Sequence, residues 1–316
     1  MTGISEGVLK TRSIGWIGAG RMGFAMAKRL LQAGCKVAVY NRTRSKAEPL
    51  IEYGATVVDS PKELATCDIV FSMVSEGVDL REVITGPNGV LAGTARPKLL
   101  VDCSSVSEDD SSFVRAQALA VGIAMLAAPV SGNAKVVKAG KLTVVASGPR
   151  AAFEVAEPYL VALGQGVTYV GEGEVARIVK ICHNLYLGIV TQALAEITVL
   201  AQKGGVARHD FLEFLNRSIM GSTFARYKMP AFVNLELTPT FTPVLLRKDL
   251  DLGLKAGKQL GVPLPLTSLT REYVQKTIDA GLQERDFAVL LLEQAKASGL
   301  ELKSENAQVN DGLSGG

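Results

Sequence analysis

The stretch "SIGWIGAGRMGFAMAKRLLQAG", residues 13–34, decides the fold. It begins with a short apolar run typical of a buried strand, passes through Gly18, Gly20 and Gly23, and continues as an amphipathic helical pattern. A second apolar run, "KVAVY" (36–40), follows directly. A strand, a glycine-rich turn, a helix and another strand in this order predict the first unit of a doubly wound α/β sheet.

Short apolar runs continue to alternate with helical patterns as far as about residue 171. The runs that we interpret as buried strands are "SIGWIG", "KVAVY", "ATVV", "DIVFSMV", "KLLVDCS", "GIAMLAAPV", "KLTVVASG" and "GVTYVG". The segments that we interpret as helices or turns between them are 22–33, 45–53, 61–66, 107–121 and 150–163. This alternation predicts a mainly parallel sheet with extra strands at its far edge.

The strand pattern stops after Gly173. The helices predicted beyond it are 175–203, 207–217, 221–233, 243–260, 266–280 and 284–298. We therefore predict an α/β Rossmann-type domain over 1–174 and an all-α domain over 175–303, joined rigidly by the long helix that starts the second domain. The polar, glycine-rich end of the chain predicts a frayed tail over 304–316.

Composition narrows the class of protein. A net charge of +3 gives no sign of a nucleic-acid surface, and no apolar run approaches the length of a membrane span. The leader "MTGISEGVLKTR" lacks the apolar core of a secretion signal. The four cysteines form no CxxC pair, and with two histidines a zinc site is improbable, so we predict no metal. We expect a soluble, reduced, cytoplasmic protein.

The glycine loop indicates dinucleotide binding. Gly18 permits the tight turn, Gly20 allows the backbone to approach a pyrophosphate, and Gly23 allows close helix–strand packing at a helix N-terminus that faces the anion. We assign the whole loop, including Ala19, Arg21 and Met22, to the cofactor site. A second GxGxxA pattern at 171–176 contains two glutamates that would repel a pyrophosphate, so we interpret it as the turn into the long helix.

The end of the second strand favours a phosphorylated cofactor. An NAD site usually has an acidic residue here for the ribose 2′-hydroxyl, but this chain has Asn41, followed by Arg42 and Thr43. Loss of the carboxylate removes repulsion, and the Arg42 guanidinium can receive a 2′-phosphate. The alternative is a solvated basic turn. We predict NADP(H), with NAD(H) as the second choice.

A lysine stands in the middle of the apolar helical stretch "ARIVKICHN" (176–184). On a helix, Lys180 and Asn184 lie one turn apart on one face, together with Arg177, Gly188 and Thr191, and we expect Gly188 to leave space over them. Lys180 either extends to solvent or, at a cleft between the two domains, acts in proton transfer. In the second case Asn184 holds the reacting oxygen.

Taken together, these residues resemble the β-hydroxyacid dehydrogenases, the family of 3-hydroxyisobutyrate dehydrogenase, tartronate semialdehyde reductase and the glyoxylate/succinic semialdehyde reductases. The resemblance covers about residues 13–298. The motifs that carry it are "GWIGAGRMG", "VDCSS", "APVSG" followed by "GKLTVVASG", "KICHN" and "RKDLDLGL". It implies a 6-phosphogluconate dehydrogenase-like architecture and an oxidoreductase acting on small 3-hydroxy acids or their semialdehydes.

The resemblance also implies roles for individual residues. Lys180 is the catalytic lysine and Asn184 the catalytic asparagine beside it. Further cofactor contacts are Met73, Val74, Ser105 and Lys248. Substrate contacts are Ser131, Gly132, Asn133, Phe241 and Asp249. The partners implied are a small carboxylate substrate and further copies of this chain, as a dimer or tetramer, with neither nucleic acid nor membrane.

Three departures from the family pattern bear on the substrate. Ala127 and Ala128 stand before Pro129, Asn133 replaces a glycine, and His183 replaces the first of two paired asparagines. Asn133 would add a side-chain amide at the carboxylate site, which suggests a more polar substrate. Plainer readings are that 131–132 form only a strand-to-helix turn, and that Lys248 and Asp249 form a surface ion pair. The alternative functions are an imine reductase of the same architecture and a catalytically silent cofactor-binding module.

Overall fold

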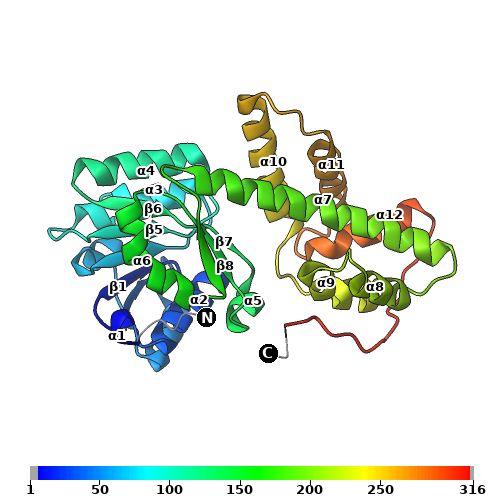
Figure 1. Cartoon of the computed structure of the whole chain (residues 1–316), viewed down its shortest axis with the longest axis horizontal. Helices are drawn as coiled ribbons and strands as arrows, with labels where there is room; N and C mark the ends of the chain where they lie inside the picture. Colours follow the sequence, from blue (N-terminus) through cyan, green and yellow to red (C-terminus); the bar gives the residue numbers. More distant parts are fainter. Residues whose placement is uncertain (1–5, 314–316) are drawn as a thin grey trace. The chain divides into compact units, whose positions relative to one another are not determined.

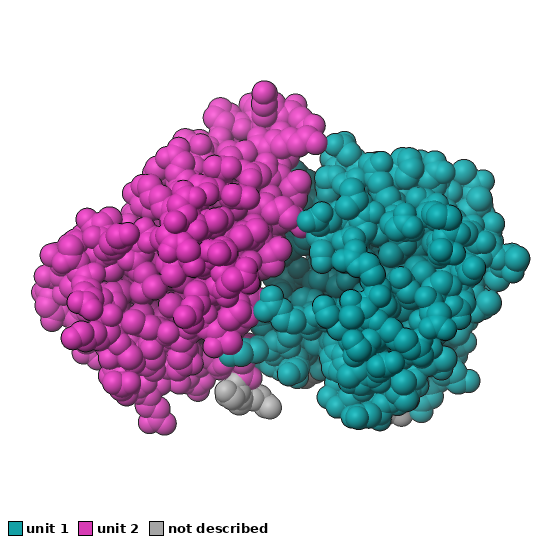
Figure 2. All heavy atoms as spheres, turned by 180° about the vertical axis from the view of Figure 1, so that it is seen from behind, with its two compact units in different colours: residues 1–180 teal, residues 181–316 magenta. Residues whose placement is uncertain are grey.

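The computed structural model describes residues 6–313 (Figure 1). The chain forms two compact units that divide between Lys180 and Ile181 (Figure 2). Unit 1 contains the strands, and unit 2 contains the remainder of a long helix and the helices that follow it. The predicted fold class, a Rossmann-type sheet followed by an all-α region, is confirmed.

Unit 1 is built on a six-stranded parallel sheet with the strand order β3-β2-β1-β4-β5-β6. The strands are β1 (Ser13–Ile17), β2 (Lys36–Tyr40), β3 (Thr56–Val57), β4 (Ile69–Ser72), β5 (Leu99–Asp102) and β6 (Ala124–Ala127). The order reverses between β1 and β4. In sheets of this kind, ligands bind at the carboxyl ends of the strands at that switch point.

Both faces of this sheet are covered, which explains why its strands read as nearly continuous apolar runs. Trp16 and Phe71 belong to the hydrophobic core on one face, whereas Ile17 and Val70 belong to the core on the other. The helices of the unit are α1 (Glu6–Leu9), α2 (Arg21–Gln32), α3 (Gly77–Thr85), α4 (Glu108–Ala120), α5 (Ala134–Lys138) and α6 (Arg150–Ala162). Short 3₁₀ turns are η1 (Arg44–Lys46), η2 (Glu48–Tyr53), η3 (Pro61–Thr66) and η4 (Val90–Ala92).

The last strands of unit 1 differ from the prediction. We expected them at the far edge of the main sheet, but β7 (Val130–Ser131), β8 (Thr143–Ala146) and β9 (Gly166–Tyr169) form a second, three-stranded sheet. The chain leaves β6 at Pro129, which has no N–H to continue a ladder. A single bridge between Ala127 and Ser147 joins the two sheets.

The helices of the second half agree with the predicted ranges, except that the last one begins at Leu290 rather than at residue 284 and follows a 3₁₀ turn. They are α7 (Val175–Lys203), α8 (Arg208–Arg217), α9 (Thr223–Asn234), α10 (Pro243–Leu260), α11 (Pro265–Asp279), the 3₁₀ turn η5 (Phe287–Val289) and α12 (Leu290–Ala297). In unit 2 they enclose a hydrophobic core that includes Phe232, Leu246, Leu250 and Leu290. By length and composition α7 would suffice to cross a membrane. Its burial of Arg177 and Asn184 indicates instead a core helix of a globular protein.

The unit boundary lies beyond the predicted one at residue 174. The first turn of α7 is part of unit 1, because Ala176 and Arg177 are buried there. The Ala176 backbone N–H donates to Ser147 Oγ at 3.0 Å, and the Arg177 guanidinium pairs with Asp102. These contacts anchor the start of α7 in unit 1, and the rigid connection between the domains stays a prediction.

The C-terminal segment is not frayed as far as the structure describes it. Glu305 accepts hydrogen bonds from the backbone N–H groups of Arg208 and His209 at 2.8 and 2.9 Å, at the start of α8. Asn234 and Ala307 exchange two hydrogen bonds of 2.8 and 3.1 Å. A capping carboxylate and a paired amide thus hold the segment to unit 2. The remainder of the predicted tail, 314–316, lies outside the described residues.

Candidate active site

The three glycines of the loop after β1 differ in the structural reason for having no side chain. Gly18 has a φ of +95°, and a Cβ there would lie 2.2 Å from Met73 O. A Cβ on Gly23 would lie 1.9 Å from Gly18 O. Gly20 is different, because its Cβ would meet nothing within 4 Å. The protein's own packing therefore explains Gly18 and Gly23, while Gly20 leaves open space over the backbone.

That open space fits a dinucleotide pyrophosphate. Gly20 is the N-cap of α2, and it provides no side chain to cap the first N–H groups of the helix. Helix N-terminal N–H groups attract anions, and a glycine lets the phosphate oxygens reach them. Ala19 and Met22 support the loop from beneath, since Ala19 is buried and Met22 packs against the core. Arg21 begins the helix at the loop.

The turn after β2 is exposed and polar. The Asn41 side chain accepts a hydrogen bond from Ala19 N at 2.7 Å and donates to Thr43 O at 2.8 Å. It therefore ties the glycine loop to the basic turn. The Arg42 side chain is 85% exposed and pairs with Asp79 of α3 at 3.1 Å. A 2′-phosphate at Arg42 would meet this carboxylate.

Other predicted cofactor residues come to the same edge of the sheet. Met73 follows β4, and its carbonyl lies against Gly18. The next residue, Val74, donates its N–H to Ser104 Oγ at 2.9 Å, which joins the loop after β4 to the loop after β5. Ser105 is the next residue of that second loop. Within unit 1 the structure thus brings together the loops after β1, β2, β4 and β5.

A buried ion pair stands behind these loops. Arg177 and Asp102 have side chains that are each 2% exposed, and Arg177 Nη2 donates to Asp102 Oδ2 at 2.5 Å. Sequence reasoning placed Arg177 on the same helix face as Lys180 but assigned it no function. An arginine in an apolar helix one turn before a candidate catalytic lysine was the available signal.

The face of α7 that carries Lys180 and Asn184 is half-buried at Lys180 and buried beyond it. Asn184 is 5% exposed, and Thr191 further along is fully buried, whereas Val179 and Tyr186 on other faces are exposed. Lys180 is the last residue of unit 1 and Asn184 lies one turn later on the same continuous helix. The polar side chains of this face therefore lie within the protein rather than in solvent from Asn184 onward.

The expectation for Gly188 was wrong. We expected it to leave space over Lys180 and Asn184. Instead, a Cβ at this position would come within 3.2 and 3.3 Å of Leu250 and Leu246, and within 3.6 Å of Thr270. The glycine therefore permits close packing of α10 and α11 against α7.

Helix α10 fixes the orientation of the Asn184 amide. Asn184 Nδ2 donates to Asp249 Oδ2 at 2.6 Å, and Asn184 Oδ1 lies 2.9 Å from His183 Nδ1. Asp249 is 5% exposed, so the reading of Asp249 as half of a surface ion pair is wrong. Lys248, the preceding residue, is half-buried. Phe241 packs edge-on against Phe287 in the core of unit 2, with ring centroids 5.7 Å apart.

The predicted carboxylate loop follows β7. Gly132 has a φ of +136°, and a Cβ there would lie 2.7 Å from Val136, so no other residue fits. Ser131 ends the strand and Asn133 caps α5, its Oδ1 accepting from the N–H groups of Lys135 and Val136 at 2.9 and 3.2 Å. The side-chain oxygen of Asn133 therefore serves the helix, and the expectation that its amide N–H groups contact the substrate stays a prediction.

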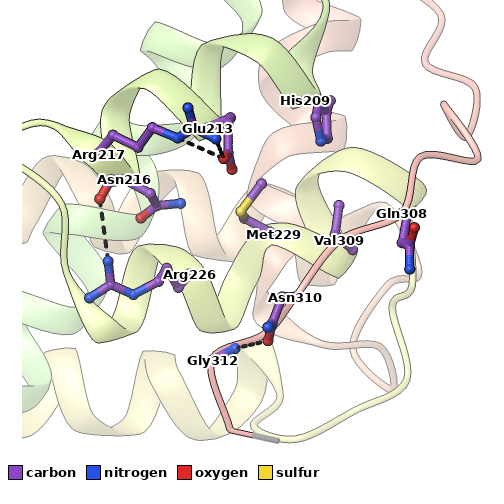
Figure 3. A pocket seen from close by; sticks show the side chains of 10 residues that line it. All are labelled: His209, Glu213, Asn216, Arg217, Arg226, Met229, Gln308, Val309, Asn310 and Gly312. Carbon is purple, nitrogen blue, oxygen red and sulfur yellow. Dashed lines mark hydrogen bonds and ion pairs between the residues drawn. The ribbon is translucent and has the colours of Figure 1, made fainter. Parts of the chain in front are cut away.

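Unit 2 contains a pocket of about 470 Å³ near α8, α9 and the C-terminal segment (Figure 3). Glu213 and Arg217 are paired with each other in its wall, and Arg226 donates to the backbone oxygen of Asn216. The pocket contains none of the predicted site residues. Over the described part of the chain, no group of three metal-binding side chains occurs.

Comparison with known proteins shows the family of the chain. Residues 13–171 match the NAD-binding domain of 6-phosphogluconate dehydrogenase, and residues 171–292 match the NAD-binding domain of NADP-dependent 3-hydroxyisobutyrate dehydrogenase. The glyoxylate/succinic semialdehyde reductase 2 of Arabidopsis thaliana is 32% identical over 291 residues, which are 92% of this chain and 81% of that protein.

Two further similarities extend the comparison. A crystal structure of 3-hydroxyisobutyrate dehydrogenase from Salmonella typhimurium is 28% identical with a TM-score of 0.80, over 89% of this chain and 99% of that one. The human cytokine-like nuclear factor N-PAC is 30% identical over 281 residues, 88% of this chain but only 51% of that protein. The chain therefore belongs to the NAD(P)-dependent hydroxyacid dehydrogenase family that includes the 3-hydroxyisobutyrate dehydrogenases and the semialdehyde reductases.

Proposed function

We propose that this protein transfers hydride between NADP(H) and a small 3-hydroxy acid or its semialdehyde, with Lys180 as the general acid and base. The observation that carries the proposal is the polar face of α7. It places Lys180 in unit 1, the unit that holds the glycine loop, and Asn184 one turn further along the same helix. The oriented amide of Asn184 supports its role beside the lysine.

Each group has a defined task in this reaction. The nicotinamide supplies or accepts the hydride. Lys180, as the ammonium form, donates a proton to the oxygen of the carbonyl group during reduction and takes it back from the hydroxyl during oxidation. Asn184 positions that oxygen. Ser131 and the backbone of Gly132 hold the substrate carboxylate through hydroxyl and N–H donors.

The preference for NADP(H) rests on the turn after β2. Asn41 stands where an acidic residue would repel a 2′-phosphate, and Arg42 is exposed and offers a planar set of donors. We expect NADPH to be favoured over NADH by about tenfold or more in kcat/KM, or roughly 1.4 kcal/mol. Equal kcat/KM values would contradict this part of the proposal.

The central test combines a substrate panel with one variant. Short semialdehydes and 3-hydroxy acids are assayed with both cofactors, and Lys180→Met is compared with the parent. Methionine keeps the helix propensity of the position. We expect NADPH binding, titrated by fluorescence, to persist while kcat falls by about 10²–10⁴-fold. Lys180→Met turnover within about threefold of the parent, a change of less than ~1 kcal/mol in the barrier, would refute the role of the lysine.

The same assays separate the alternatives. An imine reductase would reduce a ketone only when an amine is also supplied. A catalytically silent module would bind NADPH without turning over any member of the panel. Lys180 favours the dehydrogenase over both, because the resemblance implies Asp or Tyr at this position in the imine reductases and loss of the lysine in a silent module.

We also propose a cytoplasmic homo-oligomer. All four cysteines are free thiols, which agrees with a reducing compartment. In unit 2, Leu200, Phe214 and Ile219 are large apolar side chains that are exposed in the single chain, which supports self-association through this unit. Light scattering coupled to size-exclusion chromatography tests it, and a monomer at micromolar concentration would contradict it.

A further inference from the structure

Arg177 makes more specific contacts than the stability of a helix start requires. Its Nη1 donates to Ser104 O at 2.5 Å, its Nη2 to Asp102 Oδ2 at 2.5 Å, and both Nε and Nη2 contact Ser111 Oγ at 3.2 and 3.0 Å. A planar guanidinium bound at several points fixes both the position and the rotation of the helix that carries it.

Asp102 is the centre of the same network. Besides Arg177, it accepts hydrogen bonds from Ser72 Oγ at the end of β4 and from Ser104 Oγ after β5, both at 2.7 Å. Ser104 Oγ in turn accepts the N–H of Val74 at 2.9 Å. One carboxylate therefore organises the two loops that contain the predicted cofactor residues Met73, Val74 and Ser105.

We propose that Arg177 is a positioning residue for Lys180, which lies three residues later on α7 and in the same unit. Through Asp102 and Ser104 it sets the height and rotation of the first turns of α7 against the cofactor loops. The position of the lysine ammonium is thereby fixed relative to the nicotinamide site. This inference rests on the proposed function, because it assumes that Lys180 transfers the proton.

A purely structural role is the competing explanation. Buried ion pairs contribute little net stability compared with well-packed apolar side chains, so a need for stability alone does not account for this one. The ion pair is explained if the orientation of α7 matters, because the contacts of Arg177 to the Ser104 backbone oxygen and to the Asp102 side chain are directional. The two explanations differ in whether the effect of Arg177 on turnover passes through Lys180.

A double-mutant cycle separates them. Arg177→Lys retains a positive charge near Asp102 but loses the planar guanidinium and its several N–H donors. In the parent background we expect its kcat to fall by about 10- to 100-fold, the loss typical of a misplacement on the order of 1 Å, with little change in the dissociation constant for NADPH. In the Lys180→Met background, followed by single-turnover kinetics, Arg177→Lys should cause almost no further loss.

The chain offers a matched control in Lys228→Arg, which alters the buried Lys228–Asp286 pair of unit 2. Lys228→Arg should lower the melting temperature about as much as Arg177→Lys does, but it should cause no selective fall in kcat. If Arg177→Lys does not fold, Ser111→Ala replaces it. This variant removes the two contacts to Ser111 Oγ and leaves the ion pair, and it should lower kcat by about threefold, again only when Lys180 is present.

The outcomes are distinct. Equal losses from the Arg177 or Ser111 substitution in both backgrounds would overturn the positioning role while leaving the proposed function intact. Unchanged kcat in folded Arg177→Lys would also overturn it. Full turnover by Lys180→Met alone would refute the proposed function, and the inference with it.

Discussion

Asn184 donates from Nδ2 to Asp249 Oδ2 at 2.6 Å, and this buried hydrogen bond joins α7 to α10. Because an amide can be rotated by half a turn, its orientation is set by its partners. A carboxylate accepts only, so Asp249 requires the amide nitrogen on its side and directs the Asn184 oxygen toward His183. Asn184, one helical turn after Lys180, is therefore oriented by a side chain 65 positions away.

Removal of this carboxylate should affect both stability and substrate binding. Asp249→Ala leaves a buried amide without its acceptor, which should cost about 1–3 kcal/mol in the free energy of unfolding. The substrate KM should rise, because Asn184 then loses the carboxylate that orients its amide nitrogen. Denaturant unfolding and steady-state kinetics measure the two effects.

Asp251→Ala on the same helix is the matched control. Asp251 pairs with Arg271 at 2.9 Å on the surface, and such a pair is worth only about 0–1 kcal/mol. If the Asp249 and Asp251 variants had the same stability and the same steady-state kinetics, the hydrogen bond between Asn184 and Asp249 would have no role in function.

Asp79 should weaken the preference for NADPH. Its carboxylate pairs with Arg42 at 3.1 Å and would repel a 2′-phosphate bound there. Asp79→Asn should therefore tighten NADPH binding by a factor of about 3–10, the range of an exposed ion pair or slightly more, and leave NADH binding unchanged. The effect should shrink at high salt.

Asp59→Asn serves as the comparison, since Asp59 pairs with Arg44 of the same turn. Fluorescence titration with both cofactors gives the ratio of dissociation constants. Tighter binding of NADPH in the Asp59 variant but not in the Asp79 variant would move the 2′-phosphate contact from Arg42 to Arg44.

The sequence predicted the elements whose signals are local. All eight stretches interpreted as strands contain one, and the six C-terminal helices follow the predicted ranges except for the later start of α12. Helix α3 was missed because it is short and begins at Gly77, and α5 because it has only five residues after the Asn133 cap. The second sheet was misplaced because strand pairing depends on contacts between distant segments, such as Ala127 with Ser147.

Within the site, the motif residues were predictable and their neighbours were not. The glycine loop and the Lys180–Asn184 pair are encoded by spacing along the chain. The packing of Leu246 and Leu250 over Gly188, and the pairing of Arg177 with Asp102, join segments about 60–75 residues apart. Such contacts depend on how helices pack on one another, which helical periodicity alone does not determine.

The four thiols should differ sharply in reactivity. Burial raises the pKa of Cys35 and of Cys67 to about 11 and raises the pKa of Cys103 further, whereas Cys182 is exposed. The thiolate is the reactive form, so near pH 8 a thiol reagent should modify one cysteine rapidly in the native protein. In denaturant without reductant it should modify all four. Rapid native labelling that survives Cys182→Ser would contradict the burial of the others.

The glycine loop offers the sharpest test of the cofactor site. A Cβ at Gly20 meets no protein atom within 4 Å, and the residue has a φ of −67°, which any amino acid adopts. Gly20→Ala should therefore leave the melting temperature unchanged or slightly raised. If a pyrophosphate occupies the space above this residue, the added methyl group should weaken NADPH binding by about tenfold or more, roughly 1.4 kcal/mol.

Gly23→Ala should behave in the opposite way, since its Cβ would lie 1.9 Å from Gly18 O, and it should destabilise the fold itself. Thermal unfolding and NADPH titration of the two variants decide the matter. Parental NADPH affinity in Gly20→Ala would mean that the cofactor does not approach the loop at this glycine.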